Sequence, residues 1–147
     1  MRAISLWQPH ATFVALGLKP FETRGWATAY RGPLLIHAAK RKMTAADYAL
    51  AARVFGADDW WLKFRVPLGA FVCIVDLVDC MDVEDMSEAD RRASNGLGDF
   101  STGRFAWRLA SVQRLVRPIP ARGRQSFWRV DLALYPTQLE IVNQIIL

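Results

Sequence analysis

Apolar and polar residues alternate along the chain in a way that predicts short strands separated by a few helices. The longest apolar run, Ala70–Cys80, is rich in β-branched residues and predicts a buried strand. Further strands are predicted over residues 3–7, 21–24, 33–39, 105–115 and 127–132, and helices over 10–16, 45–55 and from 137 onward. Strands predominate at irregular spacing. This pattern favours a mixed α+β fold, a small β-barrel surrounded by short α-helices.

Helix-capping and turn-forming residues mark the ends of several of these elements. Thr44 is a good N-cap for the helix over 45–55, and Ser87 is suited to cap a short acidic helix. The Gly-rich stretch Asn95–Gly103 predicts a loop, and Pro118 and Pro120 predict an extended turn. The helix predicted from Thr137 would be amphipathic.

Length and composition indicate one domain over residues 1–147. The chain has 147 residues, of which 52% are hydrophobic and 22% charged, so it is too apolar to be disordered. It has no apolar run long enough to cross a membrane, and its first residues lack the pattern of a signal peptide. We therefore expect a cytoplasmic protein without a membrane partner; the oligomeric state stays open.

The charge is positive and unevenly distributed. The net charge is +5, and 15 of the 19 basic residues are arginine. The segment 100–130 holds seven arginines and no acid, whereas the segment 76–90 holds seven acids and no base. Such segregation favours one basic face and a nucleic-acid partner, although it is also compatible with a role in solubility alone. The arginines are Arg104, Arg108, Arg114, Arg117, Arg122, Arg124 and Arg129.

The densest group of candidate functional side chains lies at residues 19–26. If Phe21–Arg24 is extended, Glu22 and Arg24 point to the same side and share a polar surface with Lys19. Trp26 could then offer a ring on which a base stacks. The alternative is an ordinary surface ion pair, which contributes under about 1 kcal/mol.

A second group follows the strand over 33–39. His37 is either a hydrogen-bonded core residue or, if its face lines a pocket, a contact for a base or a phosphate. Lys40 and Arg41 directly after it could contact phosphates or form a solvated strand end. Cys73 and Cys80 are predicted to be reduced thiols, and the acids of 76–90 match no calcium loop, so no metal site is predicted.

Three motifs together resemble the activating-signal-cointegrator homology (ASCH) domain. They are ISLWQPHA at residues 4–11, GLKPFETRGWAT at 17–28 and YRGPLLIHAAK at 30–40. Later features agree up to about residue 132, so the resemblance covers nearly the whole chain. It implies a PUA-like β-barrel with helices packed around it, and a cleft lined by the Gly-x-Lys-x-x-Glu-x-Arg segment. The resulting candidate ligand-binding residues are Ser5, Gln8, Pro9, Lys19, Glu22, Arg24, Trp26, His37, Lys40, Arg41 and Arg104.

The resemblance also implies what the cleft does. Members of the family are linked to RNA or DNA binding, one subgroup removes the acyl group of N4-acetylcytidine, and ribonuclease activity is attributed to others. The lysine and arginine of the deacylating subgroup match Lys19 and Arg24, but its threonine falls at Glu22, and Glu84 or Glu88 match its glutamate only by region.

Three functions follow, in this order. The first is binding of single-stranded RNA or a nucleotide, with arginines on the phosphates and Glu22 accepting from a base. The second is an amidohydrolase in which Lys19 is base or nucleophile and Glu22 carries a proton. The third is a single-strand ribonuclease using Lys19, Glu22 and Arg24, with Mg²⁺ as the one cofactor considered.

Overall fold

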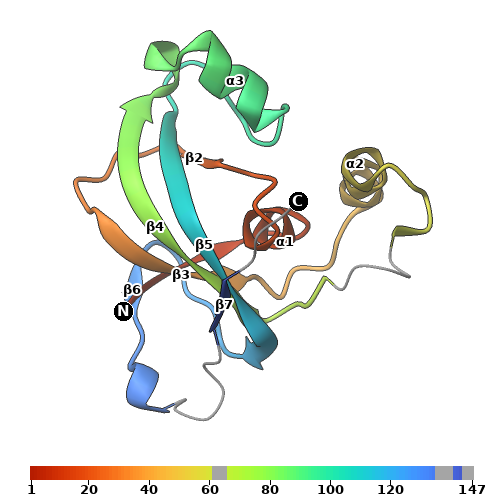
Figure 1. Cartoon of the computed structure of the whole chain (residues 1–147), viewed down its shortest axis with the longest axis vertical. Helices are drawn as coiled ribbons and strands as arrows, with labels where there is room; N and C mark the ends of the chain where they lie inside the picture. The colour runs from red at the N-terminus through yellow and green to blue at the C-terminus, as the bar shows by residue number, and fades with distance from the viewer. Residues whose placement is uncertain (61–65, 135–140, 144–147) are drawn as a thin grey trace.

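The computed structural model describes residues 1–60, 66–134 and 141–143 (Figure 1). It is a mixed α/β fold built on one sheet. The helices are α1 (His10–Ala15), α2 (Ala45–Phe55) and α3 (Glu88–Ser94), with short 3₁₀ turns η2 (Val83–Asp85) and η3 (Leu132–Leu134). The strands are β1 (Arg2–Leu6), β2 (Phe21–Arg24), β3 (Gly32–Ala38), β4 (Ala70–Asp82), β5 (Phe105–Pro120), β6 (Trp128–Arg129) and β7 (Ile141–Asn143).

The seven strands form one sheet in the order β2–β5–β4–β3–β1–β6, and β7 pairs with β5 beside this path. The pair β1–β3 is parallel, and the other pairs are antiparallel. Figure 1 shows β4 and β5 as two long, curved strands lying side by side. The end strands β2 and β6 do not pair with each other in the described part of the chain. The closed barrel expected from the sequence is therefore not confirmed.

The core explains why the central strands are almost continuously apolar. One cluster joins residues of α1, including Val14, to Ile36, Val75 and Trp107. A second cluster includes Leu35 of β3 together with Phe71 and Ile74 of β4. Successive side chains of a strand point to opposite faces, so β3 and β4 are covered on both. This buried centre of the sheet positions β1, which pairs with β3, and β2, which pairs with β5, and these two strands carry the candidate site.

The predicted capping of α2 is confirmed. The Thr44 side chain accepts from the backbone N–H of Asp47, and Asp47 Oδ2 accepts from the backbone N–H of Thr44 at 2.8 Å, which is a capping box. The helix ends at Gly56, whose φ of 74° is the left-handed conformation that glycine adopts without strain. The acidic helix α3 likewise begins after the predicted cap Ser87.

Three predictions about the second half of the chain need correction. The strand β5 does not end near Leu115 but continues to Pro120, because Ile119 is buried opposite Phe71 of β4. The predicted strand 127–132 is reduced to Trp128–Arg129, the only residues of it that pair with β1. The predicted C-terminal helix is wrong at 141–143, which form β7; its other residues lie outside the described ones.

A search of the described residues for a helix that is long and apolar enough to cross a membrane finds none.

Candidate functional site

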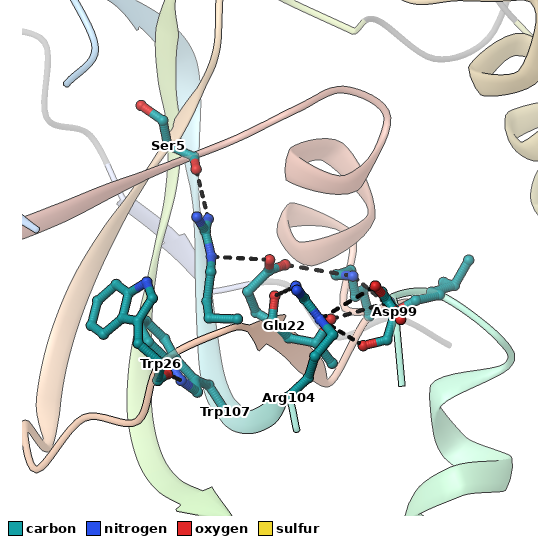
Figure 2. Close-up of polar contacts among 10 residues, drawn as sticks. Ser5, Glu22, Trp26, Asp99, Arg104 and Trp107 are labelled. Carbon is teal, nitrogen blue, oxygen red and sulfur yellow. Dashed lines mark hydrogen bonds and ion pairs between the residues drawn. The ribbon is translucent and has the colours of Figure 1, made fainter. Parts of the chain in front are cut away.

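Lys19, Glu22 and Arg24 form a continuous chain of polar contacts around β2 (Figure 2). Lys19 Nζ lies 3.5 Å from Glu22 Oε2, and Glu22 Oε1 lies 3.3 Å from Arg24 Nε. Lys19 Nζ also donates to the carbonyl oxygen of Leu97 at 2.8 Å. Arg24 Nη2 donates to the carbonyl oxygen of Ser5 at 2.8 Å. The chain of contacts therefore connects β2 to β1 on one side and to the loop after α3 on the other.

The alternation within β2 places these side chains. Phe21 and Thr23 are buried, whereas Glu22 and Arg24 are half-buried on the opposite face, as the sequence pattern predicts. Phe21 packs in a cluster with residues of β5 and η2. This packing fixes the register of the short strand and thereby the direction in which the two charged side chains point.

Burial shifts the titration of two bases beside Glu22. Lys19 is 3% exposed, and loss of hydration lowers its pKa below the ordinary 10.5, although Glu22 opposes the shift. Burial and the nearby Lys19 charge lower the pKa of His10 to about 4, so its imidazole is neutral at pH 7. His10 Nδ1 is buried without a hydrogen-bond partner. The site therefore holds a neutral imidazole and a lysine that gives up its proton more readily than usual.

Arg104 is held by three contacts with Thr23 and Asp99 (Figure 2). Its Nη2 donates to the carbonyl oxygen of Thr23 at 3.0 Å, and its Nε donates to that of Asp99 at 3.1 Å. The Asp99 carboxylate lies 3.5 Å from the same Nε. Hydrogen bonds from Ser101 lower the pKa of Asp99, so this carboxylate is ionised at neutral pH.

These side chains surround a hollow of about 360 Å³, which we call the lysine cavity. Its positive charges, on Lys19, Arg24 and Arg104, are each within 4 Å of a carboxylate of Glu22 or Asp99. The lysine cavity is therefore polar, but its charges are largely compensated within its own wall. It is lined by Ser5, Leu6, Trp7, His10, Lys19, Glu22, Thr23, Arg24, Gly98, Asp99 and Arg104.

A second, larger hollow of about 1060 Å³ adjoins the first, and we call it the arginine cavity. The two cavities share Ser5, Trp7 and Arg24. The arginine cavity is lined by Ser5, Trp7, Arg24, His37, Ala39, Lys40, Leu68, Gly69, Ala121, Arg122, Gly123, Arg124, Gln125 and Ser126.

Arg24 of the arginine cavity pairs with Glu22, whereas the other three positive charges of this cavity are not compensated. Lys40, Arg122 and Arg124 are exposed, and none of them forms an ion pair with a residue of the described ranges. The described wall of this cavity contains no aspartate or glutamate. Uncompensated cations around a concave surface attract anions, and phosphates in particular.

His37 holds the loop that carries these arginines. Its Nε2 lies 2.8 Å from the carbonyl oxygen of Ala121, and its Nδ1 lies 2.9 Å from Ser5 Oγ. A carbonyl oxygen can only accept, so Nε2 carries the proton. Burial lowers the pKa of His37 and keeps the ring neutral, so Nδ1 accepts from the Ser5 hydroxyl. Both ring nitrogens are thus occupied, and the predicted direct contact of His37 with a ligand is not supported.

Gly123 packs closely against the side chains of His37 and Ser5. A Cβ atom at position 123 would come within 2.6 Å of His37 Cε1 and 2.7 Å of Ser5 Oγ. Real Cβ atoms essentially never approach so closely. The loop can therefore lie against β1 and β3 only because residue 123 has no side chain.

Four predicted site residues lie outside both cavities. Gln8 is buried, donates to the carbonyl oxygen of Pro67 and accepts from the backbone N–H of Thr12, which ties down the start of α1. Pro9 is buried beside it. Arg41 pairs with Asp47 at 3.0 Å. The ring of the fourth, Trp26, packs against other aromatic rings.

The position of Trp26 corrects the prediction that it offers a ring for base stacking beside Lys19. Its ring centre lies 4.7 Å from that of Trp107 and 5.3 Å from that of Phe127, both in edge-to-face geometry. Figure 2 shows the two tryptophans together, away from the contacts of Glu22. Trp26 is therefore a half-buried residue that packs against the core.

The exposed aromatic residue beside the site is Trp7, which sequence reasoning did not select. It is 60% exposed and lines both cavities. The sequence feature that could have selected Trp7 is its position at the end of the predicted strand 3–7, just before the helix that follows Pro9.

Only some of the arginines in the segment 100–130 line the two cavities. Arg104 lines the lysine cavity, and Arg122 and Arg124 line the arginine cavity. Arg108 instead pairs with Asp90 of α3 at 2.8 Å. The basic segment thus contributes three cations to the two cavities and distributes the others elsewhere.

The cysteines form no disulfide with each other in the described chain. Cys73 and Cys80 are free, and burial raises the pKa of the Cys73 thiol. Within the described ranges, no group of three or more His, Cys, Asp or Glu side chains is arranged to hold a metal ion.

Comparison with known proteins assigns the family. The model of the ASCH domain matches residues 4–120, and the chain belongs to the ASCH domain family. Activating signal cointegrator 1 of Homo sapiens is 26% identical over 135 residues, and that of Mus musculus is 25% identical. Each alignment covers 90% of this chain but 22% of the relative, so the chain spans less than a quarter of their length.

Solved structures agree on the fold. The crystal structure of ASCH from Zymomonas mobilis has a TM-score of 0.51 and 18% sequence identity, and covers 88% of this chain and 87% of that one. A point mutant of the same protein has a TM-score of 0.52 and 17% identity, over 88% and 89%. At this identity the likeness concerns the fold.

Proposed function

We propose that this ASCH domain binds single-stranded RNA, with phosphates in the arginine cavity and one base in the lysine cavity. The observation that carries the proposal is the set of uncompensated cations Lys40, Arg122 and Arg124 next to a compensated polar hollow. The family supports the same class of partner, since ASCH domains are linked to RNA.

The two cavities supply different parts of the recognition. Phosphates gain most from cations that have no carboxylate partner, because no ion pair has to be broken first. A base presents donors and acceptors on its edge, and Glu22 and Lys19 offer an acceptor and a donor in a hollow of about 360 Å³. Because the two cavities share Ser5, Trp7 and Arg24, one RNA strand can contact both cavities.

A salt titration tests the proposal. The affinity for a short labelled single-stranded RNA is measured between about 50 and 200 mM salt, a range over which phosphate-based binding falls steeply. We expect a linear fall of log K with log salt, and weaker competition by duplex RNA than by single-stranded RNA. No binding at low salt, or an affinity that does not change with salt, would contradict the proposal.

Amidohydrolysis is a second candidate, favoured by the place of Lys19 inside the lysine cavity, where burial lowers its pKa. A lysine whose pKa is lowered by burial gives up its proton more readily and can act as a base or a nucleophile, with Glu22 to accept or return a proton. Incubation with N4-acetylcytidine followed by chromatography tests it, with Lys19→Met as the inactive control. Absence of cytidine at high protein concentration would exclude this activity.

The ribonuclease alternative stays a prediction. A gel of the same labelled RNA after incubation with and without Mg²⁺ tests it.

A further inference from the structure

Trp7 presents an open ring at the junction of the two cavities. It is 60% exposed, although burying a tryptophan on folding would be favourable. Isolated exposed aromatic residues are common on protein surfaces, so exposure alone decides nothing. What singles out Trp7 is that it lines both cavities, together with Ser5 and Arg24.

The backbone around Trp7 is fixed. Its carbonyl oxygen accepts from the N–H of Ala11 in α1 at 3.3 Å, and the preceding Leu6 carbonyl accepts from Ala39 at 2.8 Å. The next residue, Gln8, is buried and hydrogen-bonded. The indole is therefore carried by a rigid junction between β1 and α1, so little conformational entropy has to be lost when a ligand packs on it.

Arg41 lies over the Trp7 ring. The guanidinium carbon of Arg41 is 4.0 Å from the ring centre, a cation–π contact. Arg41 Nη1 donates to Asp47 Oδ2 at 3.0 Å, and Asp47 is itself held by the capping box with Thr44. The N-terminus of α2 thus braces the indole from one side and leaves the rest of its surface to solvent.

The surrounding charges indicate what packs on that surface. Lys40, Arg122 and Arg124 line the same cavity as Trp7 without a carboxylate partner in the described chain. A ligand that suits both features carries planar aromatic groups and negative charges at short intervals. A single-stranded nucleic acid meets both conditions, whereas an apolar peptide lacks the negative charges.

We infer that Trp7 is the stacking residue for a nucleobase of the bound strand, with Arg41 as its brace. The inference rests on the proposed RNA binding and assigns the base contact that the sequence assigned to Trp26. Stacking tolerates every base, so Trp7 contributes affinity without sequence preference.

Two probes separate stacking from charge. One is a labelled oligouridylate, and the other is the same strand with stable abasic spacers in place of the bases. Trp7→Ala is expected to weaken binding of the oligouridylate by roughly 5- to 100-fold, with the slope of log K against log salt unchanged. Its affinity for the abasic strand should equal that of the wild type, because only the base contact is removed. Trp7→Phe should recover most of the loss.

Tyr48→Ala is the matched control. Tyr48 is an aromatic residue of α2 that is 50% exposed and lines neither cavity. Its replacement should leave both affinities unchanged.

Three results would overturn the inference. They are wild-type affinity of Trp7→Ala for the oligouridylate, an equal loss on the abasic strand, and a smaller salt slope in Trp7→Ala. In each of these cases the wild type still binds, and the proposed function stands. If the wild type binds neither probe at any salt concentration, the proposed function itself fails, and the inference fails with it.

Discussion

The lysine cavity and the arginine cavity share part of their lining but differ in whether their positive charges are paired with carboxylates. In the lysine cavity, Lys19 is 3% exposed and lies between Glu22 and the Leu97 carbonyl. In the arginine cavity, Lys40 is exposed and has no such partner in the described chain. A buried charge needs its partner for the fold to be stable, whereas an exposed cation is available to a ligand. The charges of the first cavity therefore contribute to the stability of the fold, whereas the exposed cations of the second are free to contact an anionic ligand.

The largest expected effect is on stability and falls on the lysine cavity. Glu22→Ala leaves the buried ammonium of Lys19 without a carboxylate, and breaking a buried pair in this way costs about 3 kcal/mol of unfolding free energy. Urea denaturation measures it. Lys40→Ala is the control and should change stability by less than about 0.5 kcal/mol, as an exposed side chain does. Equal losses in the two variants would remove the distinction between the cavities.

The next effect concerns the loop of the arginine cavity. Gly123→Ala places a Cβ against His37 and Ser5, both held on strands, so the loop must move. We expect a loss of about 2 kcal/mol, typical of overpacking, together with weaker RNA binding. Gly25→Ala is the control, because its nearest atom would be Arg104 Nη1 at 3.9 Å. Unchanged RNA affinity in Gly123→Ala would show that the loop position does not matter for binding.

A smaller effect is expected in the pH dependence of stability. The pKa of His10 is lowered to about 4, so between pH 4 and 6.5 the unfolded chain binds more protons than the folded one. Stability should therefore rise with pH across this window, and His10→Asn should reduce that rise by about 1 to 2 kcal/mol after allowance for its partial exposure. Denaturation at several pH values measures it. The same rise in wild type and variant would show that the neutral state of His10 is not a feature of the lysine cavity.

The sequence predicted the parts of this arrangement that depend on local pattern. The apolar run Ala70–Cys80 is the central strand β4, and the alternation in 21–24 places Glu22 and Arg24 on one face. The N-cap at Thr44 follows from residue type alone. Each of these features is determined within a few residues along the chain, where periodicity and capping preferences act directly.

The parts that the sequence did not predict depend on distant contacts. Trp26 packs against the core because Trp107 and Phe127 lie beside its ring, and those residues are about 80 and 100 positions away. The Nε2 atom of His37 is hydrogen-bonded because the loop that contains Ala121, 84 residues later in the chain, lies beside it. Trp7 stays 60% exposed because, of the later described segments, the one that carries Arg41 covers only one side of its ring. Such burial is set by tertiary packing, which single-sequence patterns do not contain.

The salt dependence of RNA binding by a variant lacking the three uncompensated cations tests the central claim most directly. With Lys40, Arg122 and Arg124 replaced by alanine, the slope of log K against log salt should fall by about 2, the value for three lost phosphate contacts on a single strand. The double replacement of Arg117 and Arg129, which are exposed and line neither cavity, should leave the slope unchanged. An unchanged slope in the triple variant, or the same decrease in both variants, would contradict the assignment of the arginine cavity to phosphates.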